Sequence, residues 1–475
     1  MATVSDDVFF AGIADLTRRL HEKEFSAVEL TRAFCERLER LGPRHNALAL
    51  SLRPQAIRQA HDADDELKRG RYRPLQGIPY AVKDLFAVRG HPTTWGAKPY
   101  AGQVFDEDAR VVQRLDKSGA ILIGKLAMIA LAGGGYKSAA ASLTGPCLNP
   151  WDRTRWAGGS SSGSGAATAA GLATFTLGTE TNGSIVTPSA FCGVTGLRPT
   201  YGLVSRHGVM AASWTMDKVG PICRSAEDCG LVLQVIAGSD SEDPGSAGRG
   251  FSYTPQFARK PQDLTVGYAP VDFAEWVDPA ARPAFQAALE AVKSTGVKLK
   301  EIDLPDFPYG PVADTISRGD RVSIFEDFVR SGKVDELADP AQIAWLKESM
   351  DLPAREYLRA QRIRTLIQEE FRALFVDVDM ILAPSRIDVA PKISGPIDAG
   401  SRRDPEPKSP GIHGRLVSAG NLAGLPAISL PCGFANNLPV AISFVGHPWT
   451  ENHLLGMGRL FQSQTDWHRR HPELG

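Results

Sequence analysis

The stretch from Trp156 to Thr200 decides the fold, and it reads WAGGSSSGSGAATAAGLATFTLGTETNGSIVTPSAFCGVTGLRPT. Ser160 and Ser184 each directly follow a glycine. A serine hydroxyl becomes a useful nucleophile only when a base removes its proton and fixed N–H donors stabilise the oxyanion that forms. Neighbouring glycines leave the backbone free to meet both needs, so the two serines are candidate catalytic residues.

Glycine and serine runs are also typical of flexible linkers, which is the alternative interpretation of this stretch. The flanking sequence argues against it. Residues 166–175 are small and apolar and suit a tightly packed helix, and residues 173–177 are typical of a short buried strand. A disordered linker would not lead directly into core, so we place the run inside a folded domain.

The composition is that of a globular protein without a strong charge. The chain has 475 residues, of which 43% are hydrophobic and 23% charged, and its formal net charge is −1. This balance gives no electrostatic footprint for a nucleic acid or an anionic membrane. The first residues are acidic, unlike a signal peptide, and no apolar run approaches the roughly 20 residues that span a bilayer. We therefore expect a cytoplasmic protein with neither a nucleic-acid nor a membrane partner.

The six cysteines are spread along the chain, without a C-x-x-C pair or the Cys/His spacing of a zinc site. We interpret them as reduced, mostly buried thiols. The sequence predicts no metal site and no cofactor.

Helical and extended segments alternate along the chain. Ser26 to Glu29 is a capping box, S-x-x-E, which predicts an amphipathic helix that Gly42 and Pro43 terminate. Apolar runs predict strands at residues 78–82, 120–123, 264–268, 380–383 and 440–445, and helical patterns cover residues 283–293 and 357–375. This alternation indicates the α/β class. Two stretches rich in Gly, Pro, Ser and Asp, 239–250 and 394–414, are expected to be surface loops of one domain.

A series of motifs extends the pattern around the two serines. They are Gly158-Gly159-Ser160-Ser161, GTETNGSI at 178–185, Pro188, Phe191-Cys192-Gly193 and GLRPT at 196–200, followed outward by GIPYAVKD at 77–84, NPWD at 149–152, YGLVSR at 201–206, MDKVGP at 216–221 and NLAGLPA at 421–427. Together they closely resemble the amidase signature family. The resemblance implies a central, mixed, twisted β-sheet covered by helices on both faces, in a single domain over residues 1–475. It implies a signature core at about 77–235 and a variable region at about 240–370, where the match is weak.

The resemblance also implies an amidohydrolase with a Ser-cisSer-Lys triad. The nucleophile falls on Ser184, the bridging serine after a cis peptide bond on Ser160, and the base on Lys83. Neutral Lys83 would take a proton from Ser160 and Ser160 one from Ser184, which forms an acyl-enzyme that water then cleaves. A lysine acts as a base only when burial lowers its pKa toward neutrality, and Lys83 ends an apolar run.

The family's oxyanion hole falls on the backbone N–H groups of Thr181, Asn182, Gly183 and Ser184. The chain departs from the family pattern here, since Glu180 replaces an aspartate, Asn182 replaces a glycine, and Val186-Thr187 replaces an arginine and an aliphatic residue. Asparagine tolerates positive φ better than other non-glycine residues, so we expect the turn to survive with the Asn182 side chain near the pocket.

A further departure concerns the substrate. Residues 124–131, GKLAMIAL, are apolar where the family is more polar, and Ala132-Gly133-Gly134-Gly135-Tyr136 follows as an expected mobile loop. We expect Met128, Leu131, Gly134 and Tyr136 to bind substrate. The alternative is that Met128 and Leu131 belong to the core. An apolar wall favours a neutral, hydrophobic or aryl amide, with esters and carbamates (urethanes) as further small-molecule substrates.

Two alternative functions remain. One is the A-type subunit of a tRNA-dependent amidotransferase, which needs partner chains. The apolar segment and His413-Gly414-Arg415, where that protein has an acidic residue, disfavour glutaminase activity. We expect a monomer or homodimer. The other is an α/β-hydrolase esterase using Ser161, because residues 159–163 match G-x-S-x-G. That elbow needs a preceding strand, and residues 149–156 are a poor one. His207 and His413 are interpreted as structural.

Overall fold

The structure is a computed structural model that describes residues 4–257, 259–395, 397 and 411–474. Its centre is an 11-stranded sheet with the order β1-β3-β2-β6-β8-β7-β12-β13-β11-β9-β10. In chain order these strands are β1 (Leu48–Ser51), β2 (Pro79–Lys83), β3 (Ile121–Leu126), β6 (Phe175–Glu180), β7 (Thr195–Arg198), β8 (Lys218–Cys223), β9 (Thr265–Tyr268), β10 (Lys298–Glu301), β11 (Met380–Pro384), β12 (Ala427–Ala435) and β13 (Leu438–Gly446).

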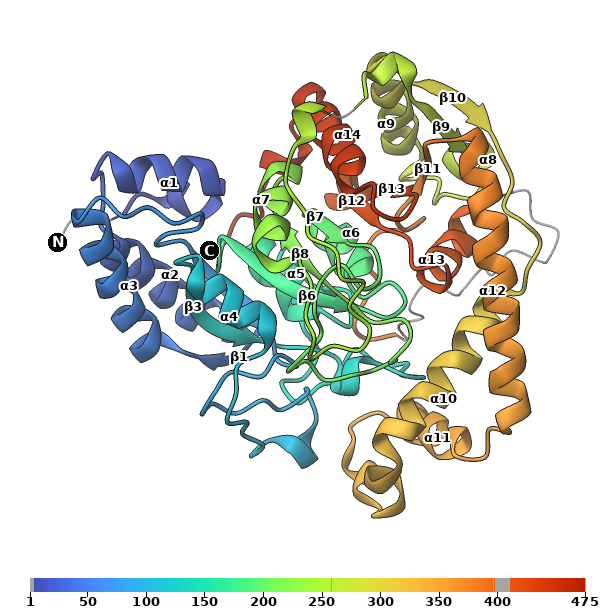
Figure 1. Ribbon diagram of the computed structural model, residues 1–475, viewed down its shortest axis with the longest axis horizontal. Helices are drawn as coiled ribbons and strands as arrows, with labels where there is room; N and C mark the ends of the chain where they lie inside the picture. The colour runs from blue at the N-terminus through green and yellow to red at the C-terminus, as the bar shows by residue number, and fades with distance from the viewer. Residues whose placement is uncertain (1–3, 258, 396, 398–410, 475) are drawn as a thin grey trace.

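The sheet is mixed. β2 pairs in parallel with β3 and β6, and β9 pairs in parallel with β10 and β11, whereas β6, β8, β7, β12, β13 and β11 form a run of antiparallel pairs. Helices lie on both sides of it (Figure 1). The α/β class and the mixed sheet with two covered faces are therefore confirmed.

The helices fall into groups (Figure 1). One end of the molecule holds α1 (Ile13–His21), α2 (Ala27–Leu41), α3 (Arg53–Lys68) and α4 (Arg110–Lys117), and the middle holds α5 (Ser162–Ala169), α6 (Val186–Cys192), α7 (Ala226–Ile236) and α14 (Glu451–Gln464). The remainder are α8 (Val271–Ala274), α9 (Arg282–Ser294), α10 (Tyr309–Arg330), α11 (Pro340–Ser349), α12 (Ala354–Asp377) and α13 (His413–Leu422). The helices α10 to α12 form a projecting group at the end opposite to α1–α3.

Local sequence explains where these elements begin and end. The expected capping box forms, because Ser26 Oγ accepts from Glu29 N and the Glu29 carboxylate accepts from Ser26 N, and α2 runs to Leu41. All five expected strands and both expected helices are confirmed with small shifts of their ends. Residues 239–250 form a loop, as expected. The second expected loop, 394–414, lies largely outside the described residues, and its last two residues begin α13.

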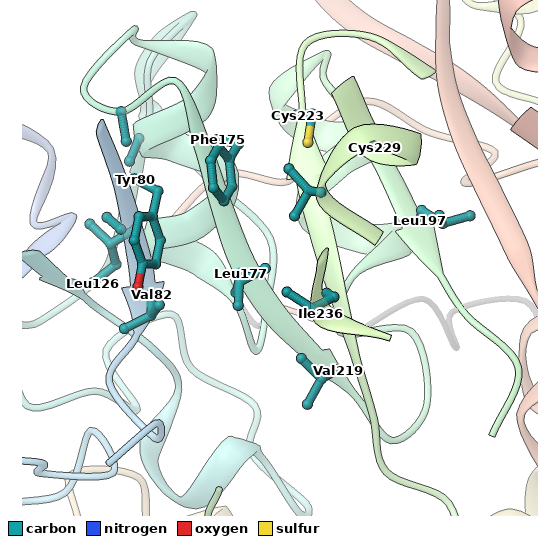
Figure 2. Close-up of a cluster of buried hydrophobic side chains, with 14 of the residues drawn as sticks. Tyr80, Val82, Leu126, Phe175, Leu177, Leu197, Val219, Cys223, Cys229 and Ile236 are labelled. Carbon is teal, nitrogen blue, oxygen red and sulfur yellow. The ribbon is translucent and has the colours of Figure 1, made fainter. Parts of the chain in front are cut away.

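The main core lies along the central strands. The β2–β6 register pairs Tyr80 with Phe175 and Val82 with Leu177, and the two aromatic rings stack with centroids 5.2 Å apart (Figure 2). Ile236 of α7 packs on the same cluster. All five side chains are at most 1% exposed, and burying such a group contributes about 1.5–3 kcal/mol to folding. This packing fixes β2 and β6, which carry the candidate site at their C-terminal ends.

Two expectations about the central stretch are wrong in detail. The helix expected at 166–175 is α5, which spans Ser162–Ala169, so the second half of the serine and glycine run is helical, and the whole run is buried. Gly171 ends it with φ +63, because its left-handed conformation breaks the helix. Residues 149–156 were expected to be a poor strand, yet β4 (Leu148–Asn149) and β5 (Asp152–Trp156) form a separate two-stranded sheet. Polar residues can form this pair because part of it faces solvent.

All six cysteines are buried and unbonded to one another. Among the helices of the described residues, none is both long and apolar enough to cross a membrane. The cytoplasmic location and the single-domain organisation stay predictions.

Candidate active site

Lys83 is the last residue of β2 and lies at the centre of the candidate site. Its Nζ is 2.7 Å from Ser160 Oγ and 3.0 Å from Thr179 Oγ1. The lysine is fully buried, and burial lowers its pKa to about 7, against the opposing field of Asp217. Near neutral pH a large fraction of this amine is therefore unprotonated and able to accept a proton.

Ser160 lies in the segment that connects β5 to α5. The Gly159–Ser160 peptide bond is cis, as the family resemblance implied. The turn packs tightly, because a side chain on Gly158 would lie 2.7 Å from the Cα of Pro188 in α6. Only glycine allows this approach, which brings the segment of Ser160 against the helix that begins two residues after Ser184.

Ser184 lies on the turn between β6 and α6, and hydrogen bonds to the Glu180 carboxylate stabilise that turn. One carboxylate oxygen of Glu180 accepts from the backbone N–H groups of Ile185 at 2.9 Å and Val186 at 3.0 Å. The other accepts from Arg198 Nη1 at 2.8 Å and from Asn421 Nδ2 at 2.9 Å.

These bonds decide the charge of Glu180. Burial alone would raise its pKa, but the Arg198 guanidinium and the N–H of Val186 lower the pKa to about 2. The carboxylate is therefore ionised at any physiological pH. A fully buried, ionised residue thus holds the backbone directly after Ser184.

The four residues of the expected oxyanion hole have different environments. Thr181 Oγ1 donates to Asp217 Oδ1 at 2.5 Å, and Gly183 has φ +97, a conformation that favours glycine. Asn182 is exposed, and its Nδ2 lies 3.3 Å from Ser418 Oγ. Among the described residues Asn182 is not one of those with positive φ, so its replacement of glycine needs no left-handed conformation here.

The apolar segment after β3 has a different place from the one expected. Met128 and Leu131 have no exposed surface and belong to the main hydrophobic cluster, as the core alternative had it. Gly134 and Tyr136 remain partly exposed. The physical reason is that the segment follows the buried strand β3 directly along the chain and therefore stays in the core.

The glycine-rich loop was expected to be mobile, and the structure anchors it instead. Gln342 of α11 donates to Gly133 O at 2.9 Å, and the Asp339 carboxylate accepts from the N–H groups of Lys137 and Ser138 at 2.6 and 2.9 Å. A side chain on Gly135 would lie 2.3 Å from Trp345 Cβ. The region of weak family match, at about 240–370, therefore anchors a loop that was expected from the sequence to be mobile.

Sequence reasoning missed Arg386 altogether. It lies two residues beyond β11, and its guanidinium donates to Thr187 Oγ1 in the first turn of α6. The available signal was a charged residue shortly after a buried apolar strand, because ligands in α/β folds often bind beyond the carboxyl ends of strands.

Ser161 does not have the geometry of a nucleophile elbow. It is fully buried, and its Oγ donates to Thr179 O at 3.2 Å, whereas an elbow exposes its serine on a turn after a strand of the main sheet. The strand before it, β5, is not part of the 11-stranded sheet. The structure contradicts the esterase alternative for this reason.

The two histidines have local partners. His413 Nδ1 is 2.8 Å from Asp272 Oδ1, and His207 Nε2 is 3.2 Å from Glu107 Oε2. Their hydrogen bonds agree with the structural roles expected for them.

Comparison with known proteins matches this chain to one family. The family model described as Amidase matches residues 29–455. The chain is 37% identical to the A-type subunit of the glutamyl-tRNA(Gln) amidotransferase of Methylococcus capsulatus, over 97% of this chain and 98% of the relative.

Solved structures agree in fold. A native peptide amidase from Stenotrophomonas maltophilia superposes with a TM-score of 0.84 at 28% identity, covering 98% of both chains. A protein from a vestigial complex that reveals the origins of an s-triazine catabolic enzyme superposes with a TM-score of 0.85 at 30% identity, covering 95% of this chain and 98% of that one.

Proposed function

Because the chain belongs to the amidase family, whose enzymes act on amide C–N bonds, we propose that it hydrolyses amides through an acyl-enzyme on Ser184. The observation that carries this proposal is the 2.7 Å contact between Lys83 Nζ and Ser160 Oγ, where burial lowers the lysine pKa to about 7. A base with a pKa near the working pH is the most effective one.

Lys83 takes the proton of Ser160 as Ser160 takes that of Ser184, and Ser184 Oγ forms a bond to the carbonyl carbon. The proton returns along the same path to the amine, which leaves as the C–N bond breaks. Water then attacks the ester of Ser184, and the acid is released. Esters and carbamates present the same carbonyl carbon, so they are expected as further substrates.

The negative charge on the carbonyl oxygen needs donors. We assign this role to the backbone N–H groups of residues 181–184. The Glu180 carboxylate accepts hydrogen bonds from the next two N–H groups, those of Ile185 and Val186, and so leaves the earlier N–H groups of the turn available to the substrate. No metal or cofactor is needed for these steps.

A second candidate is an amidotransferase A-type subunit that acts with partner chains. The names of the relatives support this alternative better than a free-standing hydrolase. Both candidates use the same acyl-enzyme chemistry and differ in whether the isolated chain is active.

The two candidates are separated by assaying the purified chain after size-exclusion chromatography. The substrates are a 4-nitroanilide, a 4-nitrophenyl ester, an aryl carbamate and L-glutamine. Hydrolysis of the anilide by the isolated chain supports the free-standing enzyme. Activity on glutamine alone, or on none of the four until a partner is added, supports the dependent subunit.

We expect Gly183→Ala to lower kcat by about 10²–10³-fold, the usual effect of losing one oxyanion donor. The new Cβ would lie 2.9 Å from Arg386 Nη2 at a residue with φ +97, so the turn must move. Asn182→Ala is the matched control, because its exposed side chain makes only the 3.3 Å contact with Ser418. Equal losses in the two variants, each with unchanged far-UV circular dichroism, would contradict the assignment of the turn.

We expect Leu131→Ala to lower the free energy of unfolding by about 2–5 kcal/mol, because it opens a cavity in the core. The kcat/KM ratio between aryl and aliphatic amides should not change. Leu143→Ala, at a residue with 41% exposure, should stay within about 0.5 kcal/mol. A change of this ratio at near-normal stability would instead show that Leu131 lines an apolar substrate pocket. The expectation of a neutral, hydrophobic substrate depended on an apolar pocket wall, and the burial of Met128 and Leu131 in the core removes that argument.

A further inference from the structure

Arg386 lies directly against the turn that carries Ser184. Its guanidinium donates to Thr187 Oγ1, and a side chain on Gly183 would come within 2.9 Å of Arg386 Nη2. The two contacted residues stand on either side of Ser184 in the chain. The positive charge of Arg386 is therefore placed against the turn that carries Ser184.

This charge has no carboxylate partner in the described part of the chain. The buried Nε of Arg386 also lacks a hydrogen-bond acceptor there. Among the charged groups that act on Arg386, Glu180 has the largest effect on its pKa, but four other donors already occupy the Glu180 carboxylate. Taking a guanidinium out of water costs free energy that a neutral hydroxyl such as Thr187 Oγ1 does not offset.

Trp156 carries a second buried donor that has no acceptor among the described residues. Trp156 Nε1 is fully buried without a partner among the described residues, and the Trp156 ring lies beside Tyr136 with centroids 6.1 Å apart. Tyr136 is close enough to Arg386 for each group to affect the pKa of the other. The Trp156 ring also contacts the Gly159 position, next to Ser160. Near the two serines, the described residues therefore hold a guanidinium without a carboxylate partner and a buried indole N–H without an acceptor.

We propose that Arg386 binds an ionised carboxylate on the acyl part of the substrate, so that the chain prefers amides of dicarboxylic acids. This inference rests on the proposed function and adds the substrate class. The acyl side is assigned because Arg386 touches the residues around Ser184, to which the acyl group becomes attached, and a guanidinium matches a carboxylate with two parallel N–H bonds.

The test uses two 4-nitroanilides with the same leaving group. N-succinyl-4-nitroaniline carries a terminal carboxylate, and N-butyryl-4-nitroaniline has a methyl group in its place. We expect the wild-type enzyme to prefer the succinyl substrate. Arg386→Ala should lower kcat/KM for that substrate by about 10- to 100-fold, mainly through KM, and should change kcat/KM for the butyryl substrate by less than about 3-fold. Arg386→Lys should recover part of the preference.

Arg415→Ala is the matched control. Arg415 belongs to α13, which also borders the turn through Ser418, but its guanidinium already has Asp303 as a partner. Its removal should leave the ratio between the two substrates unchanged.

Three results overturn the inference. They are equal losses on both substrates in Arg386→Ala, an unchanged ratio in that variant, and a wild-type enzyme that does not hydrolyse the succinyl substrate although a fluorophosphonate labels Ser184. Failure of a different kind overturns the proposed function itself, namely no hydrolysis of either anilide together with no labelling of Ser184.

Discussion

Ser184→Ala is expected to lose amide hydrolysis by about 10⁶-fold in kcat and to lose covalent labelling by a fluorophosphonate. The reason is that no other hydroxyl in the described site can form the acyl-enzyme. Ser160 is committed to Lys83 at 2.7 Å, and Ser161 is buried against the backbone of Thr179. The measurement is intact-protein mass spectrometry after labelling, together with the rate of 4-nitroaniline release.

Ser161→Ala is the matched control for this result. It removes a neighbouring hydroxyl whose hydrogen bonds go to the Thr179 backbone alone, so the variant should still be labelled. A Ser184→Ala protein that takes up the label at another serine would refute Ser184 as the nucleophile.

Lys83→Met is expected to lower kcat by about 10²–10⁴-fold, the usual contribution of a general base. Methionine keeps most of the buried volume and removes the amine. In the wild-type enzyme burial lowers the Lys83 pKa to about 7. The active form is the unprotonated one, so kcat/KM should rise as the pH increases through about 7 and then level off. This rise should be absent from the residual activity of Lys83→Met.

A second buried lysine, Lys218, provides a control for the assignment of Lys83 as the base. Burial also lowers the pKa of Lys218 well below its usual value, and no acceptor for its Nζ lies among the described residues. Lys218→Met should keep the rise of kcat/KM with pH. If the rise disappears in Lys218→Met and persists in Lys83→Met, Lys83 is not the base.

Local signals in the sequence were enough for the elements around the site. Apolar runs predicted β2 and β11 to within a residue or two, because buried strands need continuous apolar side chains and turns interrupt them. The boundary of α5 was missed by four residues, since serine and glycine are poor helix formers in isolation. Burial between β6 and α6 overrides that preference, and no single-sequence pattern reports it.

Part of the site could be expected from motifs, and part could not. The pairing of Lys83 with Ser160 joins residues of two motifs that the sequence already offered. The partners of the turn are scattered, since Arg198, Asn421 and Arg386 come from β7, α13 and the segment after β11. Their meeting depends on the strand order β6-β8-β7-β12-β13-β11, which local sequence patterns do not encode.

By itself the sequence determined the family, the α/β class and the alternation of the elements, and it supplied the candidates for nucleophile, bridge and base, because each depends on neighbouring residues in the chain. Only the tertiary structure decided that Met128 and Leu131 are core, that the glycine-rich loop is anchored by α11, and that the Arg386 guanidinium lies against the Ser184 turn without a carboxylate partner among the described residues. The physical reason is that burial and charge pairing are properties of residues distant in sequence, which acquire their values only when the sheet brings them together.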